Sequence, residues 1–77
     1  MFNETQKHHV AERLTTELDG ATEDQIVKVG DLVQHVAALN PSNDVEYLLG
    51  VIDPETNADE MVVKAAHICL AELAVNN

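Results

Sequence analysis

The chain has 77 residues, with fourteen acidic side chains against four basic ones, a formal net charge of −10 and a single cysteine. This length makes one domain, residues 1–77, near the size below which a lone core is only marginally stable. The negative charge opposes binding to nucleic acid or anionic membranes, and one cysteine excludes an internal disulfide framework. We therefore expect a cytoplasmic, single-domain protein with no direct nucleic-acid or membrane partner.

The first predicted helix begins near Asn3 or Thr5 and ends at Leu18, before an Asp-Gly pair that favours a turn. Its apolar residues recur at helical spacing on a narrow stripe. That stripe comprises Val10, Ala11, Leu14 and Leu18.

A second helix is predicted to start at Thr22, because Gln25 three residues later completes the pattern of a capping box. It ends before Asn40-Pro41, since the residue preceding a proline is disfavoured in helical geometry. The 3.6-residue period separates two faces. The apolar face carries Ile26, Val29, Leu32, Val33, Val36, Ala37 and Leu39, and the polar face carries Lys28, Asp31, Gln34 and His35.

Two further helices follow. A short third helix is predicted from a cap at Ser42, Asn43 or Asp44 to Ile52, and Asp53-Pro54 ends it. Asn57 and Glu60 form a possible capping pair for a last helix to Val75. The broad apolar face of that helix comprises Met61, Val62, Ala65, Ala66, Ile68, Cys69 and Leu73, widened by Val63 and Leu70. We expect an all-α fold, a small antiparallel four-helix bundle with a short third helix, whose last helix packs against several others or against a second subunit.

The segment DPETNADEMVVK, residues 53–64, invites comparison with a calcium-binding loop. The first four ligand positions would be filled by Asp53, Glu55, Asn57 and Asp59. However, Ala58 stands where glycine makes the sharp turn, and Lys64 replaces the bidentate glutamate. The segment is better explained as a helix-breaking turn followed by an N-cap with acids that favour the helix dipole.

Other candidate chemistry is incomplete. His8 with Glu12, and His67 with Cys69, are too few ligands for a zinc site. The run SNDVEYLL at a helix start resembles the acyl carrier proteins, but the only serine, Ser42, lacks their Asp-Ser-Leu pattern. No glycine-rich phosphate loop and no set of nucleophile, base and oxyanion donors is present. We predict no cofactor, no metal site and no enzymatic activity.

Acidic residues dominate the middle of the chain. Between Val29 and Val63 there are seven acids and no lysine or arginine. Six of them flank the third helix and are called the acidic rim: Asp44, Glu46, Asp53, Glu55, Asp59 and Glu60. With Tyr47 between them, they would form a negative border around an apolar centre that attracts a basic partner. The alternative is that they merely solvate a small domain.

The run EDQIVKVGDLVQHVAALNPSNDVEYLLG resembles the second and third helices of the immunity proteins that neutralise nuclease colicins and pyocins. In that family a helix ends near His-Pro, and a short third helix reading Asp-Leu-Ile-Tyr-Tyr-Pro follows. Asn40-Pro41 and the run from Asp44 to Leu48 stand at the corresponding places, with Leu48 in place of the second tyrosine. The resemblance implies that the contact with a nuclease is carried by Asp44, Tyr47 and acids of the second helix such as Glu23 and Asp31.

Size and charge are also similar to those of small acidic phage inhibitors, including anti-restriction and anti-CRISPR proteins. We therefore expect a non-enzymatic acidic protein that inhibits a nuclease or effector with a basic, nucleic-acid-handling surface. Charge complementarity or nucleic-acid mimicry would provide the recognition. The alternative function is a self-associating assembly module, a homodimer joined through the last helix with Val63 and Leu70 near the interface.

Overall fold

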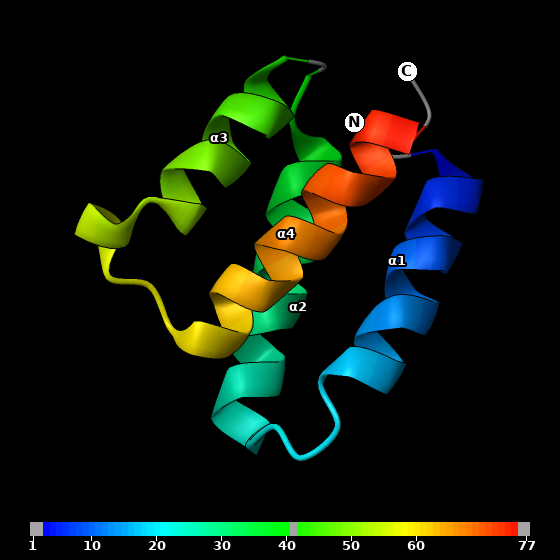
Figure 1. Cartoon of the computed structure of the whole chain (residues 1–77). Coiled ribbons are helices and arrows are strands. Elements are labelled where there is room, and N and C mark those ends of the chain that lie inside the picture. The colour runs from blue at the N-terminus through cyan, green and yellow to red at the C-terminus, as the bar shows by residue number, and fades with distance from the viewer. Residues whose placement is uncertain (1–2, 41, 76–77) are drawn as a thin grey trace.

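The computed structural model describes residues 3–40 and 42–75, which form four α-helices and one short 3-10 helix. The helices are α1 (Glu4–Glu17), α2 (Glu23–Ala38), α3 (Asn43–Ile52) and α4 (Glu60–Val75), and the 3-10 helix η1 (Pro54–Thr56) lies between α3 and α4. Successive helices run in opposite directions (Figure 1). The predicted all-α bundle with a short third helix is confirmed.

Local signals set the starts of α1 and α2. Asn3 and Gln6 form a reciprocal capping box, and the predicted box of Thr22 and Gln25 is present as well. In the second box the Gln25 N–H donates to Thr22 Oγ1 at 3.2 Å, and the Thr22 N–H donates to Gln25 Oε1 at 2.9 Å. Gly20, at a φ of +88°, makes the turn between the two helices, a conformation that glycine adopts without steric cost.

Helix α4 lies in the middle of the bundle and contacts α1, α2 and α3. Figure 1 shows α3 and α1 on opposite sides of α4. Buried residues from all four helices meet there: Val10, Val29, Leu32, Val36, Leu48, Ala65, Ala66, Cys69 and Leu73. The breadth of the apolar face of α4 thus follows from its three neighbours within the chain.

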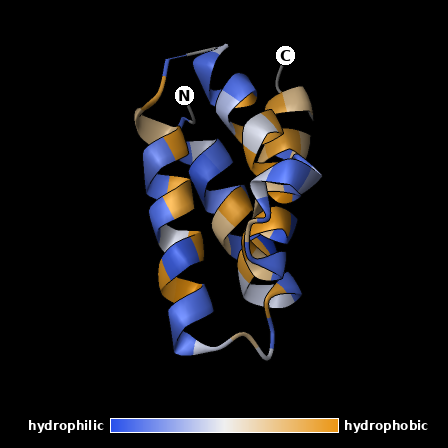
Figure 2. Cartoon of the chain, turned by 90° about the vertical axis from the view of Figure 1, so that its left-hand side faces the viewer, coloured by the Kyte–Doolittle hydropathy of each residue, from blue (hydrophilic) through white to orange (hydrophobic). Residues whose placement is uncertain are grey.

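Figure 2 shows hydrophilic and hydrophobic residues alternating along the helices, as expected of elements with one buried and one solvated face. Two predicted core positions are wrong, because Ile26 is 55% exposed and Ala11 is exposed. For Ile26 the physical reason is a gap between α1 and α2, both of which pack on α4. This apolar groove of about 360 Å³ is lined by Leu14, Thr15, Leu18, Ile26, Val29 and Gly30.

Candidate functional site

The acidic rim lies around α3 and the start of α4, and most of its side chains face solvent. Glu46, Asp53, Glu55 and Glu60 are exposed, and Asp59 is half-buried. Asp44 differs from the expectation, because it is only 2% exposed and belongs to the interior. A partner therefore meets five carboxylates of the predicted six.

Asp44 has a structural role in the first turn of α3. Its Oδ1 accepts a hydrogen bond from the Val45 N–H at 2.7 Å. Burial acts to raise the pKa of this carboxyl, but interactions that include hydrogen bonds from the backbone of Val45 and Ser42 outweigh it, so the pKa lies below its ordinary value. Ser42 occupies the N-cap position, at a φ of +80°, without a side-chain capping bond. Sequence spacing could not distinguish this inward-facing acid from its exposed neighbours.

The segment from Asp53 to Asp59 is a turn and a cap, as expected. Asp53 Oδ1 accepts from the Glu55 N–H at 3.0 Å and so opens η1, and Thr56 Oγ1 donates to the Gly50 carbonyl at 2.6 Å. The predicted capping role of Asn57 is wrong, because this residue ends η1 in the left-handed conformation at a φ of +55°. The start of α4 is capped instead by Asp59, whose Oδ1 accepts from the Met61 N–H at 2.8 Å.

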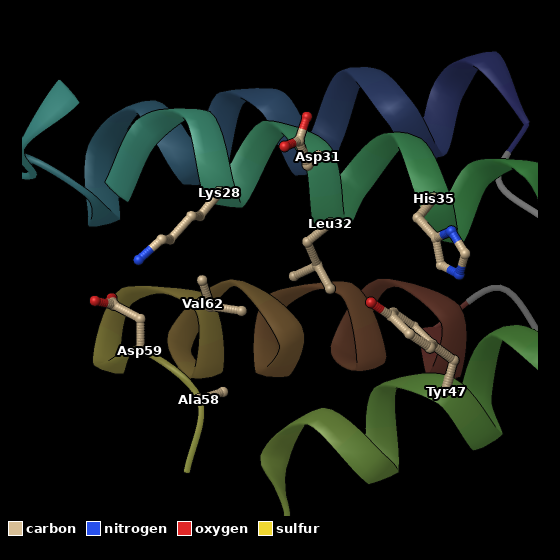
Figure 3. A pocket seen from close by; sticks show the side chains of 8 residues that line it. All are labelled: Lys28, Asp31, Leu32, His35, Tyr47, Ala58, Asp59 and Val62. Carbon is tan, nitrogen blue, oxygen red and sulfur yellow. The ribbon is translucent and has the colours of Figure 1, made fainter. Parts of the chain in front are cut away.

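A groove of about 510 Å³ brings three of the predicted contact residues together. It lies between α2, α3 and the start of α4, and Figure 3 shows its lining residues: Lys28, Asp31, Leu32, His35, Tyr47, Ala58, Asp59 and Val62. Asp31, Tyr47 and Asp59 come from three different segments. Glu23, in the first turn of α2, is exposed but does not line this groove.

Lys28 and His35 line the groove but are not among the site residues predicted from the sequence. The signal was present, since Lys28, Asp31 and His35 share the polar face of α2 at helical spacing. The sequence does not show which helix packs against that face. The ring of His35 lies 4.5 Å from the ring of Tyr47, centroid to centroid, at an interplanar angle of 53°. This ring pair joins α2 to α3 at one end of the groove (Figure 3).

Lys28 and Asp59 lie at the other end of the groove (Figure 3). Lys28 Nζ is 3.0 Å from Asp24 Oδ2, and the hydrogen bond and charge of Asp24, with a smaller effect from Asp59, raise the pKa of the lysine. Asp59 Oδ1 also accepts from Gln25 Nε2 at 3.3 Å. The groove thus combines a paired cation, the Asp59 carboxylate, an aromatic pair and the apolar side chains of Leu32 and Val62, whereas the Asp31 carboxylate points away from it (Figure 3).

Three of the four basic residues of the chain pair with acids outside the rim, and the fourth, Lys64, is exposed and forms no ion pair with a described residue. Lys7 Nζ lies 3.7 Å from Glu4, Arg13 lies 3.9 Å from Glu17, and Lys28 pairs with Asp24, in each case within one helix. Within residues 3–40 and 42–75, no lysine or arginine forms an ion pair with Glu46, Asp53, Glu55 or Glu60. These four carboxylates of the rim keep their negative charge available to a partner.

Of the residues considered for metal chemistry, His8 and Glu12 lie close together on α1, with 2.9 Å between His8 Nε2 and Glu12 Oε1, but a pair is too few to hold a metal ion. In the part of the chain that the structure describes, no three His, Cys, Asp or Glu side chains are arranged to hold a metal ion. Cys69 is fully buried, and burial raises the pKa of its thiol to about 11, which disfavours the reactive thiolate. His9 Nδ1 lies 3.0 Å from the buried Glu72 carboxylate and so links α1 to α4.

Comparisons with protein-family models, with curated proteins and with solved structures find no match for this chain. The resemblance to the immunity proteins therefore stays a prediction. Among the described helices, none has the length and apolar character needed to cross a bilayer.

Proposed function

We propose that this chain is a non-enzymatic binding protein that inhibits a protein with a basic, nucleic-acid-handling surface. The observation that carries the proposal is the set of exposed rim carboxylates without lysine or arginine partners, beside a groove that contains Tyr47. Glu46, Asp53, Glu55 and Glu60 supply the exposed charge. Tyr47, 37% exposed, supplies an amphipathic anchor.

Attraction of the partner and its retention have different physical causes. A net charge of −10 on 77 residues attracts cationic surfaces over a distance of about one Debye length, roughly 8 Å at physiological salt. Such steering mainly raises the association rate. Aromatic side chains at the centre of an interface more often set the dissociation rate, because they bury apolar area at low entropic cost.

Nucleases and nucleic-acid effectors are the partner class that fits this chemistry. Their substrate sites present lysine and arginine side chains to phosphates, and carboxylates spaced over a helical surface can occupy such sites. The predicted resemblances, to immunity proteins and to small acidic phage inhibitors, favour the same class. Inhibition would follow from occupying the basic surface, without chemistry on the partner.

The alternative function, self-association through α4, was based mainly on the broad apolar face of that helix. The apolar breadth of that helix is explained by its contacts with α1, α2 and α3. Leu70 packs against the core cluster within the chain, and Val63 is half-buried. A homodimer that persists at high salt and is disrupted by Leu70→Glu would support this alternative.

The function is tested by capture from a host lysate at low and high salt, followed by mass spectrometry and by purification of the captured protein. We expect a basic nuclease or effector subunit that binds at low salt, is released at high salt and loses its nucleic-acid activity when bound. Capture of proteins without basic nucleic-acid sites, or binding that leaves their activity unchanged, would refute the proposal.

A further inference from the structure

The groove between α2, α3 and the start of α4 has a composition that distinguishes among cations. One end holds the rings of His35 and Tyr47, and the other holds Lys28 and Asp59, with Leu32 and Val62 pointing into the space between α2 and α4 (Figure 3). Asp31 is a lining residue on α2, but its carboxylate points away from α3 and α4 (Figure 3). The net charge of −10 favours a cationic ligand, and the rings and apolar side chains favour one that is partly planar and able to cover apolar surface.

We propose that this groove receives an arginine side chain from the basic partner, with its guanidinium stacked on the exposed part of Tyr47. This inference rests on the proposed function and names the group that the site recognises.

The choice of arginine over lysine follows from the groove walls. A guanidinium is planar, more weakly hydrated than an ammonium and stacks on aromatic faces while donating hydrogen bonds in its plane. Tyr47 retains 37% exposure beside His35, so part of its surface is open to such stacking. Leu32 and Val62 can cover the methylene groups of the arginine stem, a contact that long cationic side chains make readily. A volume of about 510 Å³ exceeds what one side chain needs.

Lys28 acts as an intrachain competitor in this arrangement. Its ammonium is held 3.0 Å from Asp24 and also interacts with Asp59, so one end of the groove already contains a cation. An incoming arginine is repelled by that charge and therefore favours the Tyr47 end of the groove. Removal of Lys28 should consequently strengthen the binding of cations, whereas loss of a merely structural residue would not.

The test uses two capped peptides of equal charge, Gly-Arg-Gly-Arg-Gly and Gly-Lys-Gly-Lys-Gly, titrated into the intact chain at low ionic strength and followed by NMR. We expect the arginine peptide to bind about two- to fivefold more tightly and to shift the ring signals of Tyr47, the only tyrosine. Tyr47→Phe should keep this preference and Tyr47→Leu should abolish it, with helix content checked by circular dichroism. Equal affinities in the unmodified chain, or a preference that survives Tyr47→Leu, would overturn the inference.

A pair of lysine variants provides the matched control. Lys28→Gln and Lys7→Gln each remove one positive charge, and each lysine pairs with an acid of its own helix. Of the two, only Lys28 lines the groove. We expect Lys28→Gln to raise the affinity for the arginine peptide about twofold or more over Lys7→Gln. Equal effects would contradict the assignment of the groove. A nuclease inhibited without any arginine preference would refute this inference alone, whereas an arginine preference with no nucleic-acid enzyme inhibited would refute the proposed function alone.

Discussion

The same substitution at two glycines should change stability in opposite directions. Gly30 lies inside α2 and is exposed, and a Cβ built there meets nothing within 4 Å. Gly30→Ala therefore introduces no clash, and it removes the backbone entropy cost of glycine in a helix, about 1 kcal/mol. Gly20 also has open space around a built Cβ, but its φ of +88° is unfavourable for alanine. Gly20→Ala should therefore destabilise the fold by about 1–2 kcal/mol.

Thermal unfolding followed by circular dichroism measures both effects. For a domain of this size 1 kcal/mol corresponds to about 4–8 °C in Tm. We expect Gly30→Ala to raise Tm by about this amount and Gly20→Ala to lower it by at least as much. A lower Tm for Gly30→Ala would refute the reasoning, because it would mean that the α1–α2 groove is filled in solution. An unchanged Tm for Gly20→Ala would mean that the turn is not left-handed.

Three further perturbations test the packing. Leu48→Ala removes a fully buried side chain and should cost about 2–5 kcal/mol, seen as a lower urea midpoint, whereas the exposed Leu49→Ala should change it little. Because the pKa of the Cys69 thiol is raised to about 11, iodoacetamide should label it at pH 8 only along the unfolding curve, and rapid labelling of the native protein would contradict its burial. The pKa of Asp44 is lowered from 3.8, so its contribution to stability is present above that pH and is lost as the pH falls through the folded-state pKa. Asp44→Asn should therefore lower the free energy of unfolding at pH 7 and reduce the loss of stability between pH 7 and pH 3. Urea midpoints equal to those of the unmodified chain at both pH values would contradict this.

The helices and several of their boundaries could be predicted because their causes are local. The Thr22–Gln25 capping box depends only on two residues three positions apart. Helix α4 is predicted by the spacing of apolar residues within its own sequence. The cap of α4 was misassigned to Asn57, since the choice between Asn57 and Asp59 depends on the backbone path through η1. That path is set by the whole turn and not by any pair of residues.

Only part of the candidate site could be predicted, because the rest depends on how the helices pack against one another. Asp44 and Glu46 look alike in sequence, but α3 turns the first inward and leaves the second exposed. The partnership of His35 with Tyr47 depends on how α2 packs beside α3, which no local pattern specifies. Ile26 is exposed for the related reason that α1 does not close over the first turns of α2.

The central claim is that inhibition of a basic partner depends on where the negative charge lies on the chain and not on its amount. Two triple variants separate these factors: Glu46, Glu55 and Glu60 changed to Gln in the rim, and Glu4, Glu12 and Glu17 changed to Gln on α1, on the opposite side of α4 from α3 (Figure 1). Each set neutralises three exposed glutamates and raises the net charge equally.

The decisive measurement is the inhibition constant of each triple variant against the captured nuclease at physiological salt. We predict that the rim variant loses inhibition by about tenfold or more, whereas the α1 variant stays within about twofold of the unmodified chain. Equal losses in the two variants, or no loss in either, would contradict the account.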